Sequence, residues 1–166
     1  MMRQTGKQTL TMALGLMALF ALASPAHADG GRLQYVTNPL TGVALDGMDP
    51  VSYFTETEPL PGLPDYEYDW HGVPWYFANA ANRDVFIKAP EVYAPQFGGH
   101  ASYSVSRGFL SDGNPQIYEV VAQRLYLFYS LSNRDAFNLS PAATIADARK
   151  HWAELTSTLS ATAASQ

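Results

Sequence analysis

The chain has 166 residues, a length that suits one domain, and its formal net charge of −5 argues against binding to nucleic acid, whose phosphates need a basic partner surface. It contains no cysteine, which excludes disulfide bonds and thiolate metal ligands from its fold and its chemistry. Aromatic residues make up 13% of the sequence, enough to build a compact core without disulfides.

The N-terminal segment, residues 1–28, has the features of a secretory signal peptide. Arg3 and Lys7 provide a basic start, and the apolar run over residues 10–23 is short for a membrane span. The tripeptide Ala26-His27-Ala28 has the small residues typical of a cleavage site. We expect cleavage after Ala28, which leaves a periplasmic or secreted protein with no membrane attachment. A retained anchor helix is the alternative.

Short elements bounded by turn residues are predicted after a flexible leader over residues 29–43. These elements are an edge strand at 43–45, a short helix at 51–54, a hairpin formed by 66–70 and 74–77, and a helix at 80–88. Asp49 and Asn79 stand at the N-cap positions of the two helices, and Pro50 suits the first helical position. The pair His71-Gly72 makes the hairpin turn.

The second half of the chain predicts a strand-like segment, a second hairpin and a long amphipathic helix. The strand-like segment is residues 102–106, the hairpin is formed by 117–121 and 124–129, and the helix begins at Ser140-Pro141. Apolar residues repeat along the helix at spacings of three and four, at Ile145, Ala148, Trp152, Leu155 and Leu159. Residues 161–166 are expected to fray. We detect no internal repeat and no second domain.

These elements predict an α+β fold over residues 44–160. Hairpins form a small antiparallel sheet, and the short helices and the C-terminal amphipathic helix pack on it.

Several short motifs of the chain occur in the order and spacing of a known family. The chain reads Asp49-Pro50-Val51, then Trp75-Tyr76-Phe77, then Phe86, Pro90 and Tyr93. This pattern resembles the YHS domain, a small module associated with heavy-metal handling, chiefly of copper, through cysteines. The resemblance covers roughly residues 44–152. Ser52, Ala78 and Asn82 stand at three positions where the family has cysteine.

A longer exported branch of that family matches the second half of the resemblance. The segment Tyr93–Gly99 and the strand Leu125–Tyr129 fit its pattern. His100 replaces a tyrosine of that branch, and Ala101 replaces its cysteine. The resemblance therefore implies the fold of the family without its thiolate chemistry.

His100 is the most notable candidate for a functional role. It follows Gly98-Gly99, where the backbone can approach a ligand closely, and a neutral imidazole there could bind a ligand or relay a proton. We hypothesise a weak copper or zinc site formed by His100 with oxygen ligands from Asp49 and Asp46. The alternative is that His100 fills a buried aromatic position, that Asp46 makes a turn and that Asp49 caps a helix.

Two further residues are candidates for contact with a small ligand. Tyr103 lies close to His100 in the sequence, and Ser52 stands at a cysteine position of the resemblance. His71 is expected to be a solvated turn residue, and His151 a surface residue of the last helix. No catalytic residue is assigned, because the chain has no Gly-x-Ser-x-Gly motif and no local Ser-His-acid arrangement.

Three functions remain open from the sequence. The preferred one is an exported, non-enzymatic YHS-like protein that acts as a binding or accessory module. The first alternative is a weak metal binder that uses His100. The second is an enzyme that uses His100 with a nearby serine or tyrosine. A metal ion or a small ligand would be the partner, and any cofactor is unknown.

Overall fold

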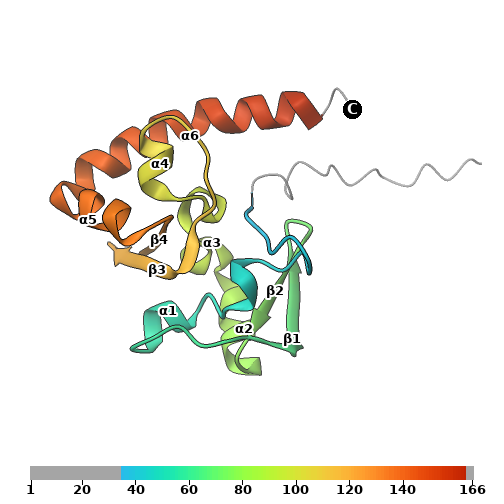
Figure 1. Ribbon diagram of the computed structural model, residues 1–166. Helices are drawn as coiled ribbons and strands as arrows, with labels where there is room; N and C mark the ends of the chain where they lie inside the picture. The colour runs from blue at the N-terminus through green and yellow to red at the C-terminus, as the bar shows by residue number, and fades with distance from the viewer. Residues whose placement is uncertain (1–34, 164–166) are drawn as a thin grey trace, which may run out of the picture.

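The computed structural model describes residues 35–163, and side chains as far as Thr158. The expected signal peptide, the leader before Tyr35 and the last three residues of the tail lie outside the described residues. The predicted α+β architecture is confirmed (Figure 1). The helices and strands are α1 (Ser52–Thr55), β1 (Leu63–Trp70), β2 (Val73–Phe77), α2 (Ala80–Lys88), α3 (Pro90–Tyr93), α4 (Ser102–Ser106), β3 (Asn114–Val121), β4 (Arg124–Phe128), α5 (Leu131–Leu139) and α6 (Pro141–Ala163).

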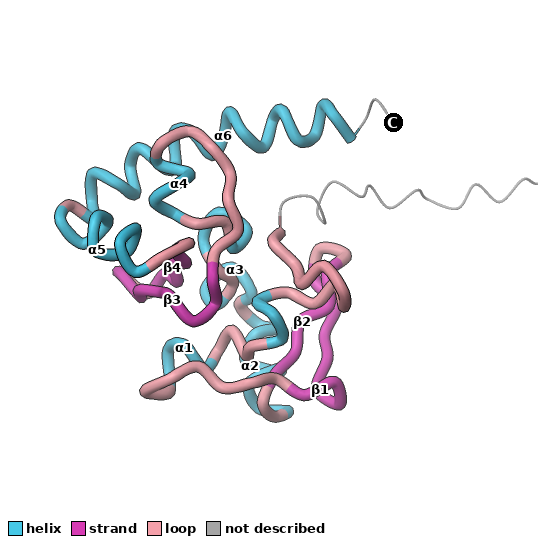
Figure 2. Tube along the Cα trace, in the orientation of Figure 1, coloured by secondary structure: helices cyan, strands magenta, loops and turns pink. Residues whose placement is uncertain are grey.

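The strands form two separate antiparallel hairpins, β1-β2 and β3-β4, in place of one small sheet (Figure 2). Each hairpin turns through two residues with positive φ. In the first these are His71 (56°) and Gly72 (71°), and in the second Ala122 (51°) and Gln123 (57°). Two consecutive left-handed residues make the tight turn that matches the twist of paired strands.

The two halves of the described chain repeat one structure. Elements begin at residues 63, 73 and 80 in the first half and at 114, 124 and 131 in the second, a constant spacing of 51 residues. We call residues 45–93 the first unit and residues 96–163 the second unit. In Figure 1 the first unit runs from cyan to green and the second from yellow to red, with the two units side by side.

The strand registers repeat as well. The first hairpin pairs Leu63 with Phe77 and slips before the pair of Glu67 and Tyr76. The second hairpin pairs Asn114 with Phe128 and slips before the pair of Tyr118 and Leu127. The register shift occurs at the same place in both hairpins. Because such a shift bends a strand in a specific way, its repetition is evidence that the two halves share one structure.

The aromatic packing under each hairpin is the same. The rings of Phe77 and Phe86 lie 5.1 Å apart at 56°, and those of Phe128 and Phe137 lie 4.9 Å apart at 60°. Each pair joins the end of a hairpin to the helix that follows it. This contact fixes the helix against the strands in both units.

A left-handed turn begins each unit. Leu45, Asp46 and Gly47 have φ values of 53°, 50° and 81°. Phe97, Gly98 and Gly99, 52 positions further on, have φ values of 56°, 61° and 85°.

The carbonyl of the last turn residue accepts a hydrogen bond from a glycine N–H in both units. Gly62 donates to Gly47 at 2.8 Å, and Gly113 donates to Gly99 at 3.0 Å. A Cβ at Gly62 would lie 2.5 Å from the backbone of Tyr76, and one at Gly113 would lie 2.5 Å from the carbonyl oxygen of Gly99. Only glycine permits this approach.

The prediction that the chain has no internal repeat is therefore wrong. The sequence keeps Asn82-Arg83-Asp84-x-Phe86 in the first unit and Asn133-Arg134-Asp135-x-Phe137 in the second. Most other positions differ, because each core accepts different rings and aliphatic side chains at equivalent places. The five-residue motif is the signal from which the repeat could have been found.

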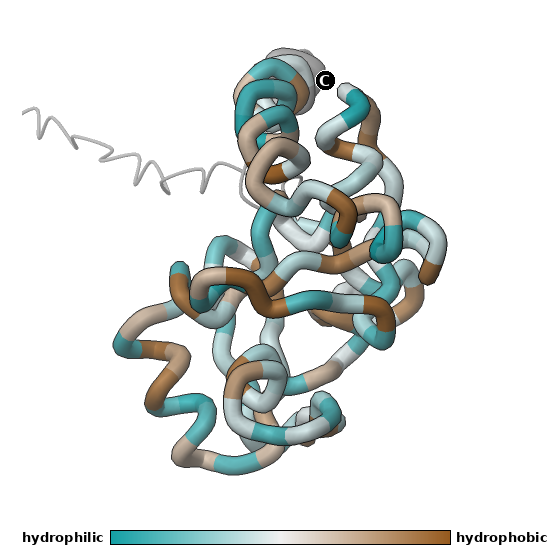
Figure 3. Tube along the Cα trace, turned by 90° about the vertical axis from the view of Figure 1, so that its left-hand side faces the viewer, coloured by the Kyte–Doolittle hydropathy of each residue, from teal (hydrophilic) through white to brown (hydrophobic). Residues whose placement is uncertain are grey.

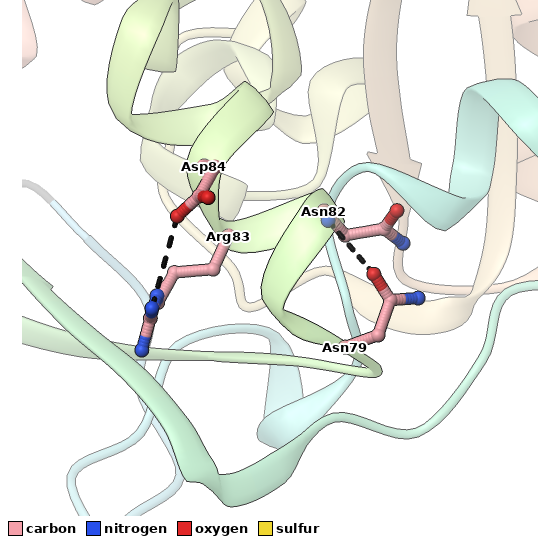
Figure 4. Close-up of polar contacts among 4 residues, drawn as sticks. All are labelled: Asn79, Asn82, Arg83 and Asp84. Carbon is pink, nitrogen blue, oxygen red and sulfur yellow. Dashed lines mark hydrogen bonds and ion pairs between the residues drawn. The ribbon is translucent and has the colours of Figure 1, made fainter.

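The two helices that carry this motif begin in the same way, with a side-chain cap. Asn79 accepts a hydrogen bond from the N–H of Asn82 at 2.9 Å, as predicted, and Figure 4 shows this contact beside the ion pair of Arg83 and Asp84. Ser130 caps α5 in the same way, through the N–H of Asn133 at 3.3 Å. A capping side chain satisfies a backbone N–H that has no partner within the helix.

Three other predictions need correction. Residues 102–106 form the helix α4 and not a strand, and Val105 donates its N–H to the carbonyl of Ala101 at 3.0 Å. The segment 43–45 contributes a single bridge from Ala44 to Thr37, because the left-handed turn follows at once. The leader is packed from Tyr35 onward, where its ring meets Trp75 edge-on at 5.6 Å.

The core consists of two clusters of buried side chains: one joins the first unit to Leu125 and Leu127 of β4, and the other lies within the second unit. Figure 3 accordingly shows brown and teal segments alternating along the chain and not one continuous apolar region. The stripe on α6 is confirmed as far as Leu155: Ala148 is fully buried, and Ile145 and Trp152 pack against the second cluster. The units meet where the Tyr53 hydroxyl donates to the Pro115 carbonyl at 2.8 Å.

Candidate functional site

A buried carboxylate organises the first unit. Asp49 is fully buried, and its side chain accepts hydrogen bonds from the N–H of Val51 at 2.8 Å and the N–H of Ala78 at 2.9 Å. The side-chain amide of Asn82 also donates to it, at 2.6 Å. These three donors satisfy the charge, as a buried carboxylate requires. We call Asp49 with its three donors the Asp49 network.

Ser52 forms hydrogen bonds to the backbone beside the same network. Its hydroxyl donates to the Asp49 carbonyl at 2.6 Å and accepts from the N–H of Leu60 at 2.9 Å. The residue is fully buried. The hydroxyl is therefore engaged on both sides, and a role of Ser52 in ligand binding stays a prediction.

Three positions that the YHS resemblance equates with cysteine come together here. Ser52, Ala78 and Asn82 all contact Asp49 through hydrogen bonds. The Ala78 N–H and the Asn82 amide donate to the Asp49 carboxylate, and the Ser52 hydroxyl donates to its backbone carbonyl. The fourth position, Ala101, is fully buried in the second unit.

The second unit has no counterpart of the carboxylate. Ala101 is the equivalent of Asp49, because its N–H bonds the Ser111 carbonyl at 2.8 Å as that of Asp49 bonds the Leu60 carbonyl at 2.9 Å. Asn133 is the equivalent of Asn82, and here its side-chain oxygen accepts from the Ser130 hydroxyl at 2.9 Å. The Asp49 network belongs to the first unit alone.

The predicted metal ligands do not form a cluster. Within residues 35–158, no three His, Cys, Asp or Glu side chains lie together in a group that could hold a metal ion. Asp49 is bound to its donors, and Asp46 accepts a hydrogen bond from Asn38 at 3.2 Å. Asp46 also lines a narrow cavity of about 20 Å³, which has room for a single water molecule.

His100 is buried in the second unit, with 8% of its surface exposed. Its ring lies 5.7 Å from that of Trp152, and neither ring nitrogen has a hydrogen-bond partner in the described part of the chain. Burial lowers the pKa of His100, and the opposing effects of Asp112 and the Ser111 backbone are smaller. The imidazole is therefore held neutral in a largely apolar setting.

The residues near His100 do not form a catalytic pair with it. The Ser102 hydroxyl is buried and also lacks a hydrogen-bond partner among the described residues, so it is not bonded to the imidazole. Ser104 bonds Ser111 at 2.7 Å. Tyr103 is half-buried against the second core cluster. An activated nucleophile needs a base within hydrogen-bond reach, and this arrangement does not provide one.

A cleft of about 360 Å³ lies where the units adjoin. The first unit contributes His71 and Glu91, and the second contributes Phe97, Arg149 and Trp152. Tyr35, the first described residue, completes the wall. We call this the junction cleft.

Two aromatic groups support the walls of the junction cleft. On one side the ring of Tyr35 lies 5.4 Å from Trp70 and 6.0 Å from His71. On the other side Trp152 meets Phe97 edge-on at 5.9 Å. Each wall of the cleft thus contains aromatic rings in contact with one another.

Sequence reasoning missed the junction cleft, because its residues come from the leader, the first hairpin, α3 and α6 and share no local motif. His71 is an exposed turn residue as predicted, and it also lines the cleft. His151 is half-buried, and a Cβ at Gly108 would lie 3.7 Å from its ring.

Comparisons with family models, curated proteins and solved structures found no match to this chain. Among the helices of residues 35–163, none is both long and apolar enough to cross a membrane.

Proposed function

We propose that this chain is an exported, non-enzymatic YHS-like protein that acts as a binding module, with the junction cleft as its binding site. The order and spacing of the family motifs support the assignment to the family. The signal-peptide features of residues 1–28 support export to the periplasm or the outside of the cell.

The observation that carries the proposal is the junction cleft. Its volume of about 360 Å³ falls in the range of small-molecule sites. The aromatic side chains of the cleft supply contact area, and its polar side chains supply specificity. The Asp49 network supports a role without thiolate chemistry, because the residues at three cysteine positions of the resemblance hydrogen-bond to Asp49.

A fragment screen read by NMR tests the proposal. Uniformly ¹⁵N-labelled protein without residues 1–28 is titrated with small polar and aromatic fragments. We expect hits to shift the signals of Glu91, Phe97 and the Trp152 indole, while those of Tyr53 in the buried core stay fixed. The absence of hits, or hits that map elsewhere, would overturn the proposed site.

A parallel titration tests the metal alternative. Copper(I), copper(II) and zinc(II) are added to the same protein and to His100→Ala. If the proposal is right, the two proteins show the same weak response. Sub-micromolar binding that His100→Ala abolishes would replace the proposal with the metal alternative.

A further inference from the structure

The junction cleft carries one cation and one anion that are not neutralised by the protein. Arg149 and Glu91 both line it, and neither side chain has an ion pair or a hydrogen bond to any described residue. The two ion pairs of residues 35–158 lie elsewhere, at Arg83 with Asp84 and at Arg134 with Glu119. The cleft therefore presents opposite charges to whatever enters it.

The two charges belong to different walls. Glu91 lies on the wall of Tyr35: burial raises the pKa of the Tyr35 phenol, and the negative charge of Glu91 raises it further. Arg149 lies three residues before Trp152 on α6, so the two side chains project from the same face of the helix. One wall thus combines a carboxylate with an aromatic ring, and the other combines a guanidinium with an indole.

This arrangement selects for a ligand that also carries both charges. An aromatic face next to a carboxylate attracts an ammonium group, through the ring quadrupole and the opposite charge. A guanidinium binds a carboxylate through paired hydrogen bonds. A ligand with only one charge would leave either Glu91 or Arg149 without a partner in the cleft.

We propose that the junction cleft binds a small zwitterion, in which an ammonium group facing Glu91 and Tyr35 is joined by a short linker to a carboxylate facing Arg149. This inference rests on the proposed function, since it names the ligand class of the same site. The acidic wall, with Glu91, comes from the first unit, and the basic wall, with Arg149, comes from the second.

Calorimetric titration with matched probes tests the ligand class. Glycine betaine and glycine are the zwitterions. The compound 3,3-dimethylbutanoate has the shape of betaine with a neutral carbon in place of the ammonium nitrogen, and tetramethylammonium has the cation without the carboxylate. We expect at least one zwitterion to bind about tenfold or more tightly than either single-charge probe.

Two charge-neutralising variants test the orientation. Arg149→Gln and Glu91→Gln should each weaken zwitterion binding by about tenfold. Lys150→Gln, next to Arg149 on α6 but outside the cleft, and Glu58→Gln, in an exposed loop, are the controls and should leave binding unchanged. All four positions are exposed, so folding is expected to be preserved.

The outcomes separate this inference from the proposed function. Equal affinity for betaine and 3,3-dimethylbutanoate would overturn the zwitterion inference, as would equal effects of the cleft variants and their controls. If fragments bind the cleft while both zwitterions fail, the inference is wrong and the proposed function stands. If nothing binds the cleft, both are wrong.

Discussion

The two units of this protein have the same backbone and different polar interiors. Both contain the left-handed entry turn, the slipped hairpin and the inclined phenylalanine pair. Only the first contains a buried carboxylate, and the second has Ala101 at that place. The comparison teaches that the fold depends on close backbone approach and ring packing, whereas the Asp49 network is an addition specific to one copy.

The largest expected effect on stability tests the close backbone contacts at Gly62 and Gly113. Gly62→Ala and Gly113→Ala each place a Cβ 2.5 Å from a backbone atom, so either should destabilise the protein by on the order of 4 kcal/mol or more. Gly72→Ala is the control: its site is open and its φ is 71°, so it should cost only about 1 kcal/mol. Urea unfolding measures all three. A tolerant response at one glycine alone would show that the units are not equivalent.

The next effect tests the ring pairs. Phe86→Ala and Phe137→Ala should each cost about 3–5 kcal/mol, because both side chains are fully buried under a hairpin. Thermal and urea unfolding of the two variants should give similar losses. A loss below about 1 kcal/mol in either variant would contradict the equivalence of the two cores.

A smaller, one-sided effect is expected for the Asp49 network. Asp49→Asn places an NH₂ group against N–H donors that face a carboxylate oxygen in the wild type. This change should lower the free energy of unfolding by about 3 kcal/mol. Asp46→Asn, whose carboxylate has one exposed partner, is the matched control and should stay within about 0.5 kcal/mol of the wild type. Equal effects of the two changes would mean that the network does not stabilise the first unit.

The smallest effect concerns pH. Burial lowers the folded-state pKa of His100, so the unfolded chain binds its proton more readily. Stability should therefore be complete above the ordinary histidine value of 6.5 and decline as pH falls below it. Met48 occupies the equivalent place in the first unit. Its backbone N–H donates to the Leu45 carbonyl, as that of His100 donates to the Phe97 carbonyl.

That equivalence supplies the test variant for the pH effect. His100→Met should lose less stability between neutral pH and pH about 5 than the wild type does, when melting temperatures are compared across the range. His71→Gln, at an exposed turn, is the control and should follow the wild type. A wild-type slope retained in His100→Met would assign the pH dependence to another group.

Local signals explain which elements could be predicted from sequence. The capping by Asn79, the two hairpins and the start of α6 at Pro141 depend on neighbouring residues, and all were found. The helix α4 was missed, because alternating serines around Tyr103 and Val105 imitate a half-buried strand. Its conformation is set by the left-handed turn before it.

The candidate site was less predictable, because it depends on contacts between distant segments. His100 was singled out from its sequence neighbours, but its ring neighbour Trp152 lies 52 residues further on, in α6. Asp49 was recognised as a possible helix cap, and only the fold shows that Ala78 and Asn82 reach it. Arg149 and Glu91 do not belong to any sequence motif that we recognised.

The bond from the Tyr53 hydroxyl to the Pro115 carbonyl ties the unfolding of one unit to that of the other. It runs from the first unit to the start of β3, and the Tyr53 ring also meets Tyr118 edge-on at 4.8 Å. If one unit opens, the other exposes a buried polar group and an aromatic face. The duplicated chain should therefore melt as a single cooperative body, with amide exchange equally slow in both hairpins.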